Sequence, residues 1–380
     1  MTLFKSYLHS RIQFVKINDH ISSILKIEFG VPQGSILGPL LFLIYINDLP
    51  NATNFFIRLF ADDTFLCSQN ENILSLENDV NFELKKVYCW LASNKLTLNV
   101  SKSKFMIISK KKNLPSLNIK INEKNLDDCD SYKYLGVYID KNLSWRPHVD
   151  YLCKKISKAC GALAKLRHCV GIDTLKTIYY ALVNSYLRYG LLAWGSASSS
   201  VLQPLNVLNN KVLRIMTFAP LGRLDTSIIY DHLQILNLEK TYLLEAGKFI
   251  FKSKNNTLPL KSIATHFSRV QNTTHGHFTR SCTRSCKNLL PIVPFHLLSS
   301  YAQKSLQLKA EQIWSTFPLD LKQAGSFSIF KAGLKKYLLN HDWISSPYYD
   351  IYYLYSIVSI VPFSFLVCFI NVLITAPEMD

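Results

Sequence analysis

The sequence predicts an α+β fold, with an antiparallel sheet and packed helices in the first part of the chain and mostly helices in the rest. Two apolar runs, residues 55–60 and 64–67, flank the pair Asp62-Asp63. This pattern is typical of a β-hairpin with the two acids at its tip. Residues 73–93 place apolar side chains at helical spacing, and a second helical stripe begins at residue 149. These three patterns decide the fold class.

The other elements are weaker and follow from local composition. Because residues 37–48 are almost entirely apolar, they predict a buried helix. Pro147 is suited to the first turn of the next long helix. The remaining expectations are a helix end at 2–10, paired strands at 11–18 and 21–29, short strands at 105–109, 117–121 and 132–139, helices at 175–189 and 202–218, and mixed helix and loop over 225–340.

Composition limits the class of protein. A chain of 380 residues is long enough for two domains, and its hydrophobic content of 48% excludes a disordered chain. The formal net charge of +17 favours a polyanionic partner, because Lys and Arg release counterions from a phosphate backbone. Nine irregularly spaced cysteines argue against a disulfide framework, and with no visible signal peptide they favour an intracellular protein.

The acid pair invites a metal. Adjacent carboxylates repel each other unless a cation lies between them, and hard divalent ions such as Mg²⁺ prefer carboxylate oxygens. Metal-assisted phosphoryl chemistry uses such acids. An ordinary solvated Asp-Asp turn is the alternative, and the dipeptide alone does not decide between them.

The segment from Gly30 to Leu49 adds a second pattern. It begins as the loop Gly30-Val31-Pro32-Gln33-Gly34-Ser35-Ile36-Leu37-Gly38-Pro39 and continues as the apolar helix. Glycines allow a ligand to approach the backbone closely, and a loop that begins a helix presents free N–H groups. Two later segments, Leu96-Thr97-Leu98-Asn99-Val100-Ser101-Lys102 and Tyr134-Leu135-Gly136-Val137, complete a set of four motifs.

In this order, the four motifs resemble the reverse transcriptases of non-LTR retrotransposons, of the jockey-like and long-interspersed-element types. The resemblance implies a partial polymerase palm over 1–143, a helical thumb over 144–222 and a C-terminal extension over 223–343. It also implies RNA-templated DNA synthesis by two-metal nucleotidyl transfer, which would place the protein in the nucleus or the cytoplasm. The partners would be an RNA template, a DNA primer and deoxynucleoside triphosphates, with Mg²⁺, or Mn²⁺ in its place, as cofactor.

The resemblance assigns roles residue by residue. Asp62 and Asp63 would be metal ligands, and Lys102 a proton donor to pyrophosphate. The nucleotide and template would meet Gln33, Gly34 and Phe60, where Phe60 stands in place of the tyrosine of many relatives. The primer grip would be Tyr134, Leu135 and Gly136, and the thumb contacts to nucleic acid would be Lys154, Lys155 and Lys158.

One departure concerns the third carboxylate of the family, which lies on an earlier strand. The stretch from Ser6 resembles the region after that strand, so we expect a domain that is truncated at its N-terminus, without fingers or the first catalytic Asp. Asp19 and Glu28 do not lie in a matching context. A catalytically inactive nucleic-acid-binding remnant is therefore the alternative to an active polymerase.

Two further features stay open. Residues 351–376 contain no charged side chain, a run longer than the ~20 residues that span a bilayer. This segment is a candidate transmembrane helix, which would make the protein membrane-tethered, or an apolar tail without that role. His275, His277, Cys282 and Cys286 are zinc-type ligands, but their spacing matches no common zinc module, so incidental cysteines in a loop are favoured.

Overall fold

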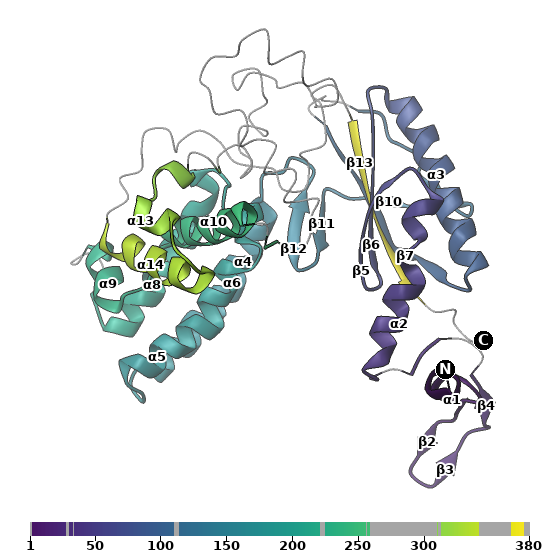
Figure 1. The fold of residues 1–380 in the computed structure, drawn as a ribbon, viewed down its shortest axis with the longest axis horizontal. Helices are drawn as coiled ribbons and strands as arrows, with labels where there is room; N and C mark the ends of the chain where they lie inside the picture. The colour runs from purple at the N-terminus through teal and green to yellow at the C-terminus, as the bar shows by residue number, and fades with distance from the viewer. Residues whose placement is uncertain are drawn as a thin grey trace. The chain divides into compact units, whose positions relative to one another are not determined.

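The computed structural model describes nine stretches of the chain, and they form two compact units (Figure 1). Unit 1 consists of residues 1–134 and 364–380, and unit 2 of residues 135–363. The described residues are 2–27, 30–32, 34–109, 114–220, 225–255, 257–258, 310, 313–341 and 366–375, and within 366–375 the side chains of 368 and 370–372 are described.

Unit 1 begins with short elements. Helix α1 (Thr2–Leu8) is followed by two nested antiparallel strand pairs, as the sequence predicts. The outer pair is β1 (Ile12–Gln13) with β4 (Leu25–Lys26), and the inner pair is β2 (Lys16–Ile17) with β3 (His20–Ile21).

Helix α2 (Leu37–Ile46) confirms the predicted helix but not its burial. Gly38 and Ile46 are buried, whereas Leu40, Leu43 and Ile44 are exposed. The prediction of a buried helix is wrong, because the helix is apolar on every side while only part of its surface is packed against other described residues. A 3₁₀ turn (Leu49–Ala52) leads on to the main sheet.

The main sheet has five strands in the order β10-β7-β13-β6-β5. Its members are β5 (Phe56–Phe60), β6 (Asp63–Asn70), β7 (Thr97–Ile108), β10 (Asp127–Asp128) and β13 (Leu366–Thr375). All neighbours are antiparallel except β10 and β7 at one edge. The α+β class is confirmed, with a mixed rather than wholly antiparallel sheet.

Helix α3 (Ile73–Ser93) has the bounds that the sequence predicts, and it supplies the core of unit 1. Asn72 begins the helix by accepting the backbone N–H of Leu74 at 2.8 Å, a typical N-cap. The apolar stripe of α3 packs on one face of the sheet. Its fully or nearly fully buried members are Leu76, Val80, Leu84, Val87 and Leu91. A small hairpin, β8 (Lys120–Ile121) with β9 (Lys124–Asn125), adds Ile121 to the same core.

The charge-free C-terminal run is a strand where the structure describes it. Residues 366–375 form β13, which lies between β6 and β7 (Figure 1). Its side chains Cys368, Ile370 and Val372 are buried in the core formed with α3. The expectation of a membrane helix is therefore wrong for these residues, and residues 351–365 and 376 lie outside the described residues. None of the helices that the structure describes has the length and apolar character needed to cross a bilayer.

Where the structure describes it, unit 2 consists of one short strand followed by helices. Strand β11 (Ser131–Tyr134) ends unit 1, and β12 (Val137–Asp140) begins unit 2. The helices are α4 (Arg146–Leu166), α5 (Ile172–Tyr179), a π-turn (Tyr180–Asn184), α6 (Ser185–Arg188), α7 (Leu191–Trp194), α8 (Ser199–Thr217), α9 (Thr226–Leu233), α10 (Leu238–Lys254), α13 (Leu319–Lys322) and α14 (Phe327–Asn340).

Helix α4 confirms the predicted apolar stripe. Val149, Leu152, Ile156 and Leu163 are buried, and the helix packs against α8. The turn before α4 is fixed by Asp140, whose carboxylate accepts the backbone N–H groups of Ser144 and Trp145. Pro147 lies in the first turn, as expected.

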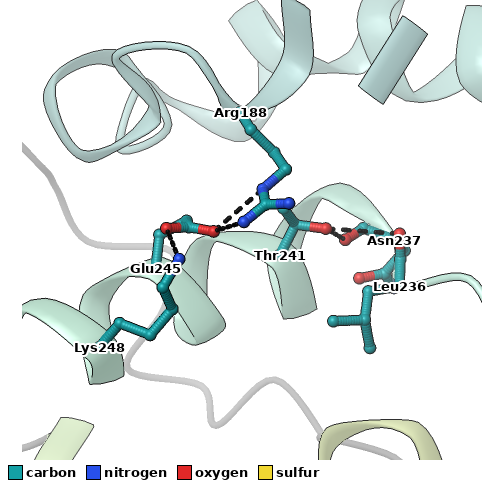
Figure 2. A network of polar contacts seen from close by, with 6 residues as sticks. All are labelled: Arg188, Leu236, Asn237, Thr241, Glu245 and Lys248. Carbon is teal, nitrogen blue, oxygen red and sulfur yellow. Dashed lines mark hydrogen bonds and ion pairs between the residues drawn. The ribbon is translucent and has the colours of Figure 1, made fainter. Parts of the chain in front are cut away.

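A polar network ties α6 to α10 in unit 2. Figure 2 shows Glu245 of α10 between the side chains of Arg188 and Lys248. Arg188 donates Nε to Glu245 Oε1 at 3.0 Å and also donates Nη2 to that oxygen, and Lys248 donates to Oε2 at 2.6 Å. The first turn of α10 is fixed separately, since Asn237 Oδ1 accepts the N–H of Lys240.

We expect Glu245→Gln to lower the free energy of unfolding of unit 2 by about 1 kcal/mol at neutral pH, a modest loss because Arg188 is partly exposed. Burial alone would raise the pKa of Glu245, but hydrogen bonds from Lys248 and Arg188 outweigh it and lower the pKa. The difference between the two proteins should therefore be complete above the ordinary Glu pKa of 4.5 and be lost as the pH falls from there through the lowered pKa of the folded state. Urea unfolding at several pH values, in a double-mutant cycle with Arg188→Gln, measures this, and no coupling at pH 7 would contradict it.

Candidate active site

The acid pair lies where the sequence predicts, at the tip of the β5–β6 hairpin. Phe60 pairs with Asp63, so Ala61 and Asp62 form a two-residue turn. Ala61 has a positive φ of 51°, which is uncommon for a residue with a side chain. The hairpin thus presents Asp62 to solvent and places Asp63 at the first position of a paired strand.

Strand alternation puts Asp63 on the face of the sheet opposite α3. The alternate residues of β6, Thr64 and Leu66, are fully buried, and Leu66 belongs to the core formed with α3. Asp63 and Phe65 therefore face the other side of the sheet. Phe65, on the same face as Asp63, packs against Tyr134 with ring centroids 5.4 Å apart. This face is therefore lined by one carboxylate and aromatic side chains.

The electrostatics of this face are unfavourable for a bare carboxylate. Burial raises the pKa of Asp63, and the charge of Asp62 raises it further. Burial also raises the pKa values of Tyr132 and Tyr134, and the Asp63 charge adds to both shifts. A cation at the hairpin tip would relieve this repulsion, so the two carboxylates fit a divalent metal.

The strand beside Asp63 carries no acid. Leu373 of β13 is the register partner of Asp63, and Asn371 is the partner of Phe65. Asn371 Nδ2 donates to the Tyr132 hydroxyl at 2.5 Å. Among the described residues no group of three or more His, Cys, Asp or Glu side chains is placed to hold a metal.

Tyr132 and Asn371 are site residues that the sequence did not reveal. Tyr132 lies two residues before the predicted Tyr134, so strand alternation would place both rings on one face. Asn371 is a lone polar residue in an apolar run, and its alternation with Ile370 and Val372 was the available signal.

The predicted nucleotide loop is described only in part. Gln33 lies outside the described residues. Gly34 has a positive φ of 77° with open space around its Cα, which suits close approach of a ligand. Two residues before α2, the Ser35 hydroxyl accepts the backbone N–H of Gly38 at 3.1 Å. Phe60, 60% exposed, presents a bare ring at the base of the hairpin turn. The contacts of Gly34 and Phe60 with nucleotide stay predictions.

Lys102 lies in β7, which is longer than the predicted strand. Its side chain is exposed, and its backbone N–H donates to Asn99 Oδ1 at 3.2 Å. Lys104, two residues on, forms an ion pair of 3.9 Å with Asp127. The role of Lys102 toward pyrophosphate stays a prediction.

The predicted primer grip is a tight turn. Tyr134 ends β11, and Leu135 and Gly136 both have positive φ values, 44° and 84°. Within unit 2, Tyr189 donates its hydroxyl to the carbonyl of Leu135 at 2.6 Å, and its ring would lie 3.2 Å from a Cβ placed on Gly136. A glycine is therefore needed here for the turn and for the tyrosine, and contact with a primer stays a prediction.

The lysines predicted to contact nucleic acid lie away from the buried stripe of α4. Lys154 and Lys158 are exposed, and Lys155 is half-buried with its ammonium 5.6 Å from the centre of the Tyr151 ring. The four zinc-type ligands His275, His277, Cys282 and Cys286 lie outside the described residues.

Comparison with known proteins shows what this chain is similar to. Residues 1–139 match the family described as Reverse transcriptase (RNA-dependent DNA polymerase). The chain is 27% identical over 229 residues to the RNA-directed DNA polymerase from mobile element jockey of Drosophila melanogaster, a match over 57% of this chain and 25% of that protein. It is 29% identical over 224 residues to the probable RNA-directed DNA polymerase from transposon X-element of the same species, covering 57% of this chain and 24% of that protein.

A third relative, the Pol polyprotein from type-1 retrotransposable element R1 of Bradysia coprophila, is 27% identical over 58% of this chain and 22% of its own length. The chain thus spans about a quarter of the length of the relatives it matches. No solved structure matches it. The resemblance predicted from the motifs is confirmed as a similarity: residues 1–139 match the reverse transcriptase family, and the relatives named above come from non-LTR retrotransposons.

Proposed function

We propose that this chain contributes to RNA-directed DNA synthesis, with the β5–β6 hairpin as the metal-binding part of the polymerase centre. The single observation that supports this most is the strained two-residue turn that holds Asp62 and Asp63 together in a chain similar to reverse transcriptases. In this reading residues 1–143 are a partial palm, 144–222 a thumb and 223–343 an extension.

The proposed roles are those that the resemblance implies, and the described positions of Asp62, Asp63, Phe60 and Gly34 are compatible with them. Asp62 and Asp63 would hold Mg²⁺ or Mn²⁺, which when bound supplies the positive charge for nucleotidyl transfer in a two-metal site. The exposed ring of Phe60 would pack beneath the primer end, and the open backbone at Gly34, with Gln33, would meet the new base pair. Lys102 would give a proton to the leaving pyrophosphate.

Metal binding tests the proposal directly. We expect Mn²⁺, followed by electron paramagnetic resonance, to bind the full chain weakly. Asp62→Asn and Asp63→Asn should each reduce the affinity about tenfold or more, because each removes a ligand. Asp48→Asn is the matched control, since Asp48 belongs to the turn before the hairpin. Equal Mn²⁺ binding by all four proteins would overturn the assignment.

We expect the 380-residue chain not to extend a DNA primer on an RNA template, even with Mg²⁺. In-line transfer between two ions needs a third carboxylate. The residue opposite Asp63 on the neighbouring strand is Leu373, which cannot bind a metal ion. A standard primer-extension gel measures this. Extension that disappears in Asp62→Ala would contradict the expectation, and Asp19 and Glu28 would then be the first acids to substitute.

The alternative function, a nucleic-acid-binding remnant without metal chemistry, is supported by the basic face of α4. We expect affinity for an RNA–DNA hybrid to fall steeply with salt concentration. The slope of log affinity against log salt concentration should become shallower by about 2 to 3 when Lys154, Lys155 and Lys158 are all changed to Gln. The same change at the three exposed lysines Lys331, Lys335 and Lys336 of α14 is the charge-matched control. Hybrid binding without Mn²⁺ binding at Asp62 would favour the remnant, and an unchanged salt slope would remove α4 from the interface.

A further inference from the structure

The main sheet of unit 1 is assembled from two distant parts of the chain. Strands β5, β6, β7 and β10 lie between Phe56 and Asp128, whereas β13 begins at Leu366. Yet β13 is the central strand, with β6 on one side and β7 on the other (Figure 1). The sheet is therefore completed from its middle by the far end of the chain.

The gap between β6 and β7 that β13 occupies is defined by residues outside β13. Strands β6 and β7 are both antiparallel to β13, so they are parallel to each other, and α3 connects them. Such a split β–α–β unit keeps its two strands one strand apart. Because α3 packs on this sheet, residues 63–108 fix the positions of β6 and β7, the two strands that flank β13.

The gap demands a particular occupant. Toward α3 it needs apolar side chains at alternate positions, which Cys368, Ile370 and Val372 supply, each fully buried. On the opposite face it needs a residue that can reach the Tyr132 hydroxyl, as Asn371 does. An extended peptide of this composition can hydrogen-bond to both flanking strands.

The present occupant fits imperfectly. Asn371 Oδ1 and Thr64 Oγ1 are buried and lack a hydrogen-bond partner among the described residues. The ladder between β13 and β7 is also irregular, with a register shift between Asn371 and Leu373. Buried polar atoms without partners and an interrupted ladder both weaken the hold of the sheet on this strand.

We propose that the gap between β6 and β7 is a strand-binding site, and that a second copy of this chain can supply its residues 366–375 to it. The second copy carries the required sequence, and the site is complete without a covalent link to the strand. Exchange of an identical element between copies is an economical route to a dimer. The inference goes beyond the polymerase chemistry, although the occupant also decides which residue lies opposite Asp63.

Disulfide trapping between two full-length chains tests the exchange. Ser68 of β6 is the register partner of Cys368, and directly opposed strand residues are close enough for a disulfide. One chain carries Ser68→Cys with Cys368→Ser, and the other keeps Cys368, with the remaining cysteines of both changed to Ser. After the chains are mixed and oxidised, we expect a covalent heterodimer on a non-reducing gel.

The matched control replaces Ser68→Cys by Gln69→Cys, the next residue, which faces the other side of the sheet. We expect at least about ten times less heterodimer from this control, and a similar loss when Ile370→Pro removes a backbone donor from the strand. Ile107→Cys repeats the test from β7, where Ile107 is the partner of Cys368, should Ser68→Cys fail to fold.

Each outcome decides. Heterodimer from Ser68→Cys or Ile107→Cys but not from Gln69→Cys supports exchange between copies. A single chain with Ser68→Cys and Cys368 that forms only an internal disulfide, without heterodimer in the mixture, overturns it. Equal heterodimer from Ser68→Cys and Gln69→Cys would mean random collision and would overturn it as well.

Discussion

Glu83→Ala should lower the free energy of unfolding of unit 1 by about 3 kcal/mol, among the largest losses available from one side chain. Glu83 lies on α3 and is buried. Its carboxylate accepts hydrogen bonds from the Thr53 hydroxyl at 2.6 Å, the Asn54 backbone N–H at 2.7 Å and Lys86 at 2.8 Å. Removing it leaves the donors at the entrance to β5 without their acceptor.

The pH dependence follows from the same contacts. Burial would raise the pKa of Glu83, but the hydrogen bonds from Lys86, Thr53 and Asn54 outweigh it and lower the pKa to about 2. The unfolded chain keeps the ordinary value of 4.5, so the stabilisation is complete above that pH and is lost as pH falls toward 2.

Hydrogen exchange of the α3 and β5 amides, followed by mass spectrometry at pH 7, measures the loss for Glu83→Ala. Glu83→Gln keeps the shape and some of the bonds and should lose about half as much. Glu77→Ala removes a carboxylate from the same helix and should cost less than about 0.5 kcal/mol. A loss for Glu83→Ala as small as that for Glu77→Ala would show that the cluster does not hold the hairpin.

Trp194→Ala should cost unit 2 about 3 to 5 kcal/mol. Trp194 is fully buried, and its Nε1 donates to the Tyr189 carbonyl at 2.8 Å. Its ring packs edge-on against the imidazole of His148 in α4, with ring centroids 5.4 Å apart. Truncation leaves a cavity and an unpaired carbonyl between α4 and the segment before α8.

Trp194→Phe separates the two contributions, because it keeps most of the volume and loses the hydrogen bond. We expect it to cost about 1 to 2 kcal/mol. Exchange rates of the α4 and α8 amides report both variants. If the Ala variant costs no more than the Phe variant, the cavity contributes nothing and the packing argument fails.

The sequence predicted correctly those helices and strands that depend on a short, continuous pattern of apolar residues. Helix α3 has the predicted bounds because its apolar period matches a helix over its whole length, and the hairpin followed from two short runs around Asp62 and Asp63. Strand β7 was predicted too short, because Asn99, Ser101 and Lys102 interrupt its apolar character although pairing with β13 extends it back to Thr97.

Long-range pairing could not be predicted from the sequence. The charge-free run that contains β13 has the length of a bilayer span, and nothing within it indicates that its partners are β6 and β7. Asn371 and Tyr132 meet only through that pairing, so neither stood out as a site residue. The acid pair was found because both members are adjacent in sequence.

The central position of β13 also determines when unit 1 can be completed during synthesis. Roughly 250 residues separate the end of β7 from β13, which a ribosome adds in about 10 to 50 s. Throughout that time β6 and β7 each present an unpaired edge, the kind of surface on which nascent chains pair wrongly with one another. Chaperone capacity during translation, more than the stability of the finished sheet, should therefore set the yield of this protein in a recombinant host.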